Sequence, residues 1–337
     1  MKKYKVAIVG ATGAVGNQMK EILQEHDFPI EKLYLFSSSR SAGKVLEFKE
    51  EQITVKELTP DSFEGIEIAL FSAGSKTSKE YVPYAVNAGC VVIDNSSAFR
   101  MQSDVPLVVP EINPFDLKWH KGIIANPNCS TIQMVMVLKP LYDRAGIKRV
   151  VVSTYQSTSG TGWKAMIELR EQCEAIMNKK EVNVQVYPYQ IAFNVIPQIG
   201  AFLPNGYTEE ELKMVNETRK ILGDETIAVS ATTVRVPVFI SHCETVNVEL
   251  KQKLTASQAK DILSSTIGVK VVDNPEDSIY PYPLMAKNKD EVYVGRIRED
   301  LSVPFGLDMW IVADNLRKGA ALNAVQIAEK MIKLRLI

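Results

Sequence analysis

The first half of the chain alternates short apolar runs with stretches of helical spacing. The spacing predicts helices over residues 14–25 and 76–88, with Gly89 in the C-cap position of the second. Strands that alternate with helices are typical of a parallel sheet covered by helices. The strands expected in this half span residues 5–9, 32–36, 67–72, 91–94, 107–109 and 122–125.

The pattern changes from residue 148 onward, where apolar runs become longer and helices fewer. This favours a mixed or antiparallel sheet in a second domain. Residues 316–333 have the spacing of a final helix, which we place back on the first domain. Residues 182–207 hold three prolines and no clear period, which is typical of a loop. The strands expected here span residues 149–156, 227–238, 244–250, 269–272, 291–298 and 307–313.

Length and charge narrow the class of protein. A chain of 337 residues favours two domains over one, and 46% hydrophobic residues are typical of a soluble globular protein. Lys and Arg number 39 against 40 Asp and Glu, which disfavours a broad basic face for nucleic acid. The apolar run from Val6 to Val9 is too short for a signal-peptide core or a membrane span, so we expect a cytoplasmic protein.

Three glycines follow the first predicted strand directly. Gly10, Gly13 and Gly16 open the helix that begins near Ala14, with the spacing GxxGxxG. Missing side chains let a backbone approach a pyrophosphate, and the free N–H groups of the helix point at it. We therefore interpret this turn as a dinucleotide site, with an ordinary strand-to-helix turn as the alternative.

The second predicted strand runs into a serine-rich turn that carries Arg40. Asp and Glu are missing at the place where one would hold a ribose 2′-hydroxyl, whereas Arg40 with its serine neighbours suits a 2′-phosphate. The turn therefore favours NADP over NAD. A solvated loop cation is the alternative for Arg40.

The four cysteines and three histidines show neither CxxC nor metal-ligand spacing, so we expect no structural zinc and no disulfide framework. Cys129 stands apart, because it falls between the strand ending at residue 125 and a helix expected over residues 130–142. At a helix N-terminus the dipole and the unpaired N–H groups favour a thiolate. Cys90 in an apolar strand and Cys173 in a helix are interpreted as packing residues.

A thiolate beside a nicotinamide cofactor indicates aldehyde chemistry, because a thiohemiacetal can give hydride to NADP and leave a thioester on the enzyme. That step needs an acid/base. The candidate is His242, which follows a strand carrying Arg235, and the alternative is a satisfied core histidine. His26 and His120 lie in polar surroundings that favour solvation.

Six motifs occur in a fixed order along the chain. They are Gly10-Ala11-Thr12-Gly13-Ala14-Val15-Gly16, Ser37-Ser38-Ser39-Arg40-Ser41-Ala42-Gly43, Asp94-Asn95-Ser96-Ser97-Ala98-Phe99-Arg100, Asn126-Pro127-Asn128-Cys129-Ser130-Thr131, Tyr155-Gln156-Ser157-Thr158-Ser159-Gly160 and the segment from Arg235 to His242. In this order the chain resembles the aspartate-semialdehyde dehydrogenase family over essentially its whole length.

The resemblance implies a fold like that of glyceraldehyde-3-phosphate dehydrogenase. Residues 1–127 and 316–337 would form a Rossmann-type NADP-binding domain, and residues 128–315 a mixed α+β catalytic and dimerisation domain. The implied reaction is reduction of 4-phospho-L-aspartate by NADPH to L-aspartate 4-semialdehyde and phosphate, in lysine (diaminopimelate), threonine, methionine and isoleucine biosynthesis. A homodimer or homotetramer with small-molecule substrates is implied, with neither nucleic acid nor membrane as a partner.

The family's catalytic residues map onto this chain motif by motif. The resemblance implies that Cys129 attacks the acyl phosphate, that His242 is the acid/base, and that Gln156 orients the acyl group. Arg235 is implied to bind the α-carboxylate of the substrate, because a guanidinium group can donate two parallel hydrogen bonds to a carboxylate.

The remaining substrate contacts carry charges that match the substrate. Glu210 is the implied partner of the ammonium group, and Arg100 with Lys213 that of the phosphate. A solvated helix face is the alternative for Glu210 and its neighbours, and a surface cation for Arg100. No metal is implied. The implied cofactor contacts are Gly10, Thr12, Gly13, Ala14, Val15, Arg40, Ser41, Ser159, Gly160 and Asn315.

Two other functions fit part of this pattern. An N-acetyl-gamma-glutamyl-phosphate reductase shares the fold and the cysteine chemistry, but it would not need Glu210 for a free amine. A dinucleotide-binding sensor without turnover would keep the fold, and the intact catalytic set disfavours it. Thr233 and Cys243 depart from the family pattern, which leaves the polarity around His242 open.

Overall fold

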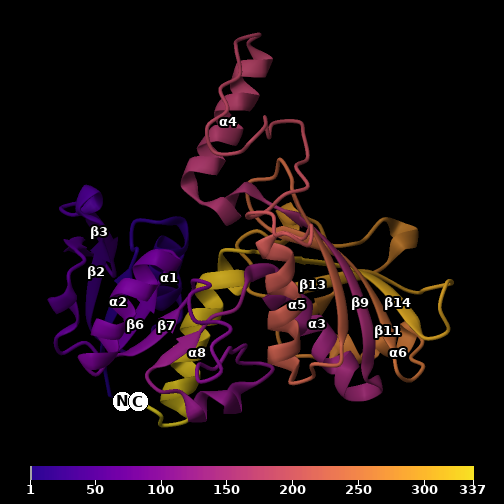
Figure 1. Ribbon diagram of the computed structural model, residues 1–337, viewed down its shortest axis with the longest axis horizontal. Coiled ribbons are helices and arrows are strands. Elements are labelled where there is room, and N and C mark those ends of the chain that lie inside the picture. The colour runs from indigo at the N-terminus through magenta and orange to yellow at the C-terminus, as the bar shows by residue number, and fades with distance from the viewer. Residues whose placement is uncertain (1) are drawn as a thin grey trace. The chain divides into compact units, whose positions relative to one another are not determined.

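The computed structural model describes residues 2–337, and the chain divides into two compact units. One unit takes in Met1–Asn128 with Ala320–Ile337, and the other takes in Cys129–Gly319. Figure 1 labels many of the elements of both units. No helix within residues 2–337 combines the length and the apolar character needed to cross a bilayer.

The first unit is built on a parallel sheet of six strands in the order β5-β2-β1-β6-β7-β8. The predicted parallel sheet is therefore confirmed. Its central strands are buried on both faces, as their continuous apolar runs require. The strands are β1 (Tyr4–Val9), β2 (Ile30–Ser37), β5 (Lys56–Glu57), β6 (Ile68–Phe71), β7 (Val91–Asp94) and β8 (Ile123–Ala125).

Helices α1 (Ala14–Glu25) and α2 (Ser75–Asn87) follow the strands as predicted, and the C-terminal helix α8 (Leu322–Lys333) packs against α1. The apolar side chains of α1, α8 and the strands form one buried cluster. Short 3-10 helices lie in the connections: η1 (Ser39–Ser41), η2 (Pro60–Phe63) and η3 (Pro114–Trp119).

Two features of this unit differ from the prediction. The expected strand at residues 107–109 is wrong, because Leu107 forms only an isolated bridge with Ala125. The hairpin of β3 (Val45–Phe48) and β4 (Glu51–Thr54) was not predicted, since both strands are short and most of their side chains are exposed.

The second unit holds a sheet in the order β10-β9-β11-β14-β13-β12, in which parallel and antiparallel pairs both occur. The predicted mixed sheet is confirmed. Its strands are β9 (Ile147–Gln156), β10 (Ala228–Arg235), β11 (His242–Leu250), β12 (Val269–Val271), β13 (Val292–Glu299) and β14 (Gly306–Ala313).

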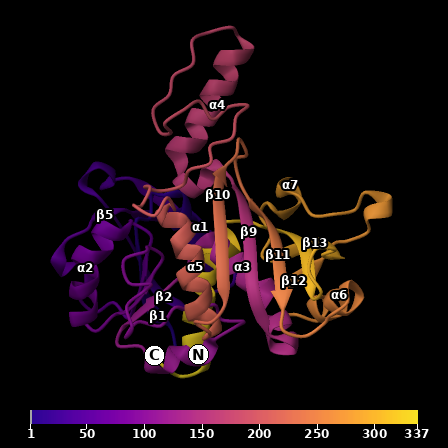
Figure 2. The same ribbon diagram turned by 45° about the vertical axis from the view of Figure 1, so that its right-hand side comes forward.

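Helices α3 (Cys129–Ala145), α5 (Glu209–Leu222) and α6 (Ala256–Ser264) contact strands of this sheet, and α3 packs on both α5 and α6 (Figure 2). Helix α4 (Trp163–Met177) and the loop after it project from the sheet in both views. The predicted final helix is wrong at its start, because a π-helical turn, Arg317–Ala321, precedes α8. The shorter helices are α6 (Ala256–Ser264), α7 (Pro283–Ala286), η4 (Thr158–Thr161) and η5 (Pro275–Asp277).

Candidate active site

The glycine turn of the first unit is shaped by close backbone contacts. Gly10 has a φ of +84°, which favours glycine, and its N–H donates to the carbonyl of Phe36 at 2.9 Å. A Cβ on Gly16 would lie 2.3 Å from the carbonyl oxygen of Gly10, so no side chain fits there. Helix α1 begins after Gly13 without a side-chain cap, which leaves its first N–H groups for an anion. The turn therefore fits a dinucleotide pyrophosphate.

The turn after β2 presents Arg40 on the surface. Arg40 lies in η1, where it is exposed, and Ser41 beside it is half-buried. Thr12 of the glycine turn is tied to the end of β2 by a 3.1 Å contact between its Oγ1 and the Oγ of Ser37. The predicted cofactor residues of this unit thus occupy neighbouring turns. Their contact with a 2′-phosphate stays a prediction.

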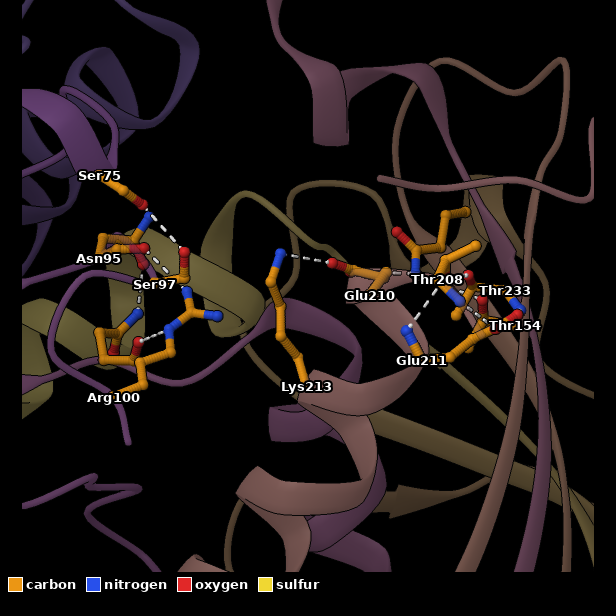
Figure 3. Close-up of polar contacts among 12 residues, drawn as sticks. Ser75, Asn95, Ser97, Arg100, Thr154, Thr208, Glu210, Glu211, Lys213 and Thr233 are labelled. Atoms are coloured by element: carbon orange, nitrogen blue, oxygen red, sulfur yellow. Dashed lines mark hydrogen bonds and ion pairs between the residues drawn. The ribbon is translucent and has the colours of Figure 1, made fainter. Parts of the chain in front are cut away.

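Arg100 is buried, so the alternative interpretation of Arg100 as a surface cation is wrong. Its Nε donates to the carbonyl of Asn126 at 2.9 Å, and its Nη2 donates to the carbonyl of Asn95 at 2.9 Å (Figure 3). Burial raises the pKa of the nearby Asp94 carboxyl, which accepts hydrogen bonds from Ser96. These contacts fix the direction of the guanidinium in the first unit.

Cys129 is the first residue of α3, one residue earlier than the predicted helix start. Its side chain is half-buried, whereas the apolar residues after it in α3 are buried. Gly319 faces it so closely that a Cβ on Gly319 would lie 2.9 Å from the Cβ of Cys129 and 3.6 Å from that of Asn315. Sequence reasoning missed Gly319, because a glycine carries no side-chain chemistry and lies 190 positions after Cys129.

His242 is the first residue of β11 and is fully buried. The backbone N–H of Ser157 donates to Nδ1 of His242 at 3.1 Å, and the Oγ of Ser157 lies 3.0 Å from the same atom. Burial, followed by the charge of Arg235, holds the pKa of His242 well below its ordinary value. The imidazole is therefore neutral at pH 7.

Arg235 ends β10 and lies against the same loop as His242. Its Nη1 donates to the carbonyl of Ser157 at 2.6 Å, and its Cζ lies 5.9 Å from the centre of the Tyr187 ring. A Cβ on Gly160 would lie 2.9 Å from Nη1 of Arg235 and 3.1 Å from Nε2 of His242. Gly160 itself is exposed, and any side chain on it would crowd both groups.

Gln156, Glu210 and Lys213 form a chain of contacts beside this loop. The carboxylate of Glu210 accepts from Nε2 of Gln156 at 3.4 Å and pairs with Nζ of Lys213 at 3.1 Å. Figure 3 shows the pair of Lys213 and Glu210 on α5. Glu211 accepts from the Thr208 N–H as a helix cap, and Glu209 is exposed. Among the three neighbours, Glu210 is the one that contacts other predicted site residues.

The two departures from the family pattern have structural explanations. The hydroxyl of Thr233 lies 3.4 Å from that of Thr208, and its N–H donates to Glu211 at 3.0 Å, so it stabilises the start of α5. Burial raises the pKa of the Cys243 thiol to about 12, which keeps it protonated and unreactive. Among residues 2–337, no group of three or more His, Cys, Asp or Glu side chains could hold a metal ion.

The second unit carries Cys129, His242, Gln156 and Arg235; Gln156 pairs with Arg235 across β9 and β10, and Ser157 contacts both Arg235 and His242. Two family models match the chain: "Semialdehyde dehydrogenase, NAD binding domain" over residues 5–120 and "Semialdehyde dehydrogenase, dimerisation domain" over residues 138–318. The fold and the site thus define a semialdehyde dehydrogenase.

Comparison with individual proteins narrows this class. The aspartate-semialdehyde dehydrogenase of Aquifex aeolicus is 57% identical over 99% of both chains. Among solved structures, aspartate semialdehyde dehydrogenase II of Vibrio cholerae complexed with ASA is 47% identical over 99% of both chains, with a TM-score of 0.96. The Candida albicans enzyme with NADP is 27% identical over 100% of both chains, with a TM-score of 0.80. The chain belongs to the aspartate-semialdehyde dehydrogenase family.

Proposed function

We propose that this chain catalyses the reduction of 4-phospho-L-aspartate by NADPH to L-aspartate 4-semialdehyde and phosphate. The observation that carries the proposal is the second unit's set of groups: a half-buried thiol at the start of α3, a neutral imidazole and a buried guanidinium. These groups suit an acyl substrate with a carboxylate. The product would supply lysine, threonine, methionine and isoleucine biosynthesis.

Cys129 acts as the nucleophile in this proposal. Its sulfur forms a bond with the acyl carbon, the bond from that carbon to the phosphate oxygen breaks, and phosphate leaves. NADPH, when bound, supplies the hydride that reduces the resulting thioester. The carbon–sulfur bond then breaks, the semialdehyde leaves and Cys129 returns as a thiolate, while His242 exchanges the proton of the former carbonyl oxygen through its Nε2. Gln156 is placed to orient the acyl group.

Arg235 and Glu210 recognise the amino-acid part of the substrate. The Nη1 of Arg235 is held by Ser157, and its buried Nε has no hydrogen-bond partner among the described residues, so the guanidinium retains donors for a carboxylate. Glu210 offers a buried carboxylate to an ammonium group. Arg100 and Lys213 are each assigned to the phosphate by their positive charge.

The first unit supplies most of the cofactor contacts in this proposal. The uncapped start of α1 after the glycine turn receives the pyrophosphate. Arg40 receives the 2′-phosphate, which makes NADP the cofactor. The residues proposed to contact it are Gly10, Thr12, Gly13, Ala14, Val15, Arg40, Ser41, Ser159, Gly160 and Asn315.

A homodimer or homotetramer completes the proposal. The second unit matches a dimerisation domain. The face of its sheet that lacks α3 and α5 carries a cavity lined by Thr245, Arg296 and Trp310, and Tyr155 on this face is exposed. Sedimentation analysis of the purified chain tests this assembly, and a single species of monomer mass would contradict it.

The decisive assay is phosphate-dependent reduction of NADP by L-aspartate 4-semialdehyde. Turnover with this aldehyde is expected. Turnover only with N-acetyl-L-glutamate 5-semialdehyde would instead identify an N-acetyl-gamma-glutamyl-phosphate reductase, and turnover with neither aldehyde a dinucleotide-binding sensor.

Arg235→Lys tests the substrate assignment within the same assay. A lysine keeps the charge but loses the second parallel hydrogen bond, so we expect KM for the semialdehyde to rise about tenfold. The dissociation constant of NADP should stay unchanged, because Arg235 is assigned to the substrate alone. An equal loss for substrate and cofactor would contradict this role.

A further inference from the structure

Asn315 lies two residues after the end of β14, and its side chain is at the centre of three hydrogen bonds. Its Oδ1 accepts from the backbone N–H of Ser241 at 2.9 Å, from Oγ of Ser157 at 3.1 Å and from Oγ of Ser159 at 3.0 Å. All four side chains are buried. Because a backbone N–H can only donate, the contact with Ser241 identifies the inward atom of Asn315 as its oxygen.

Two of these partners control His242. Ser241 precedes His242 and has a φ of +78°, an unfavourable conformation for a residue with a side chain. Its hydrogen bond with Asn315 stabilises that conformation and so sets where β11 begins. Ser157 lies on the other side of the ring, where both its N–H and its hydroxyl face Nδ1.

The contact with Ser157 fixes the tautomer of His242. A hydroxyl can donate or accept, but the Ser157 N–H only donates, so Nδ1 must carry a lone pair. The single proton of the Ser157 hydroxyl is then shared between Nδ1 of His242 and Oδ1 of Asn315 as a three-centre hydrogen bond. The proton of the neutral ring therefore lies on Nε2. This atom is buried, has no hydrogen-bond partner among the described residues, and faces the space left by Gly160.

The charges around the ring favour the same state. Arg235 is the cation beside it and opposes a second proton, and burial acts in the same direction to lower the pKa of His242. The backbone carbonyl of Ser241 favours the charged form, but its effect is the smallest of the three. In the resting enzyme, Nε2–H is thus a hydrogen-bond donor.

We propose that Asn315 is a positioning residue which, through Ser241 and Ser157, holds His242 as the Nε2–H tautomer facing the substrate. In the proposed reaction, Nε2–H then donates to the substrate oxygen on which negative charge develops when Cys129 adds to the carbon. Gly319 separates Asn315 from Cys129, so the same residue lies near both catalytic side chains. This inference rests on the proposed function only for the identity of that oxygen.

The role is separate from the cofactor contact assigned to Asn315. The three hydrogen bonds use its oxygen, so a contact with bound NADP would come from its amide nitrogen. Loss of the oxygen should change the state of His242, whereas loss of the nitrogen should change NADP affinity. The two roles can therefore be measured independently.

The test uses the full chain labelled with 15N-histidine. The chain has only three histidines, and a His242→Gln variant assigns the signals of His242. We expect the wild-type ring to show an unprotonated Nδ1 and a protonated Nε2 at neutral pH. A ring protonated at Nδ1 would overturn the proposal without any variant of Asn315.

Asn315→Ala then tests the residue itself. We expect both nitrogen signals of His242 to move toward a mixture of tautomers and kcat to fall about tenfold or more, because the donor loses its fixed geometry. The matched control is Thr158→Val, a buried neighbour whose hydroxyl bonds the carbonyl of Val238 instead of Asn315. That variant should leave the His242 signals and kcat unchanged.

Two outcomes would contradict the positioning role. Unchanged His242 signals in Asn315→Ala would remove it, and so would a loss confined to NADP affinity. If Asn315→Ala does not fold, Asn315→Asp keeps an oxygen acceptor for all three donors and should retain an Nδ1 hydrogen bond from Ser157. Absence of aldehyde turnover in the wild type would contradict the proposed function while leaving the tautomer measurement intact.

Discussion

Gly160→Ala adds one methyl group beside Arg235 and His242, and so tests whether the substrate reaches these two residues past Gly160. A Cβ there would lie 2.9 Å from Nη1 of Arg235 and 3.1 Å from Nε2 of His242. Gly160 is not among the residues with positive φ, so alanine adds no left-handed strain. The effect of Gly160→Ala therefore reports crowding at these two groups.

The magnitude follows from how firmly both neighbours are held. Ser157 accepts from Nη1 of Arg235 at 2.6 Å through its carbonyl and donates to His242 at 3.1 Å through its N–H. Unstrained non-bonded contacts need about 3.5 Å, so the groups must separate by several tenths of an ångström. Since a misplacement of about 1 Å can cost about 100-fold in rate, we expect kcat/KM to fall about tenfold. This corresponds to about 1.4 kcal/mol in the barrier.

The assay is reduction of NADP by L-aspartate 4-semialdehyde and phosphate, followed by the absorbance of NADPH. The midpoint of thermal unfolding should stay close to wild type, and titration with NADP measures separately any loss of the cofactor contact assigned to Gly160. Thr158→Val in the same turn is the control, and we expect it to cost about 1 kcal/mol of stability without loss of rate. Wild-type kcat/KM in a folded Gly160→Ala enzyme would refute the proposed path to His242 and Arg235.

Three further changes test other parts of the molecule. Cys129→Ser should lower turnover by about 1,000-fold or more while NADP titration shows unchanged binding, and a near-normal rate would exclude the nucleophile role. Arg40→Asp should shift the ratio of kcat/KM values for NADP and NAD at least about tenfold toward NAD, and an unchanged ratio would make Arg40 a bystander. Burial raises the pKa of Glu244 well above its ordinary value. The folded chain therefore keeps a proton that the unfolded chain releases above about pH 4.3, so wild-type stability falls as pH rises. Glu244→Gln has no group that titrates there, so its thermal midpoint should rise relative to that of the wild type between pH 4 and pH 8. A difference in thermal midpoint that does not change with pH would contradict the raised pKa of Glu244.

Local patterns of apolar residues predicted most helices and strands of the fold. They failed where an apolar, buried segment does not pair with a neighbouring strand. Helix α1 and strand β7 have the predicted bounds, because each buries one periodic stripe or one continuous run. Val108 is as apolar and as buried as a strand residue, yet its segment pairs through one bridge only. Apolar residues report burial, and burial alone does not show which backbone groups pair.

The types of the site residues were predictable, but the choice among neighbours was not. Three glutamates in a row look alike in a sequence. The fold separates them, since Glu211 caps its own helix, Glu209 is exposed and Glu210 contacts Gln156. Such differences depend on the direction of α5 against the sheet, which no local pattern contains.

Backbone groups explain what the sequence could not indicate at all. Ser157 holds Arg235 with its carbonyl and His242 with its N–H, and every residue except proline carries the same two groups. Gly160 and Gly319 act by lacking a side chain next to His242 and Cys129. Backbone hydrogen bonds and absent side chains do not depend on a recognisable residue type. Only the folded backbone therefore identifies the positions that hold the reactive groups in place.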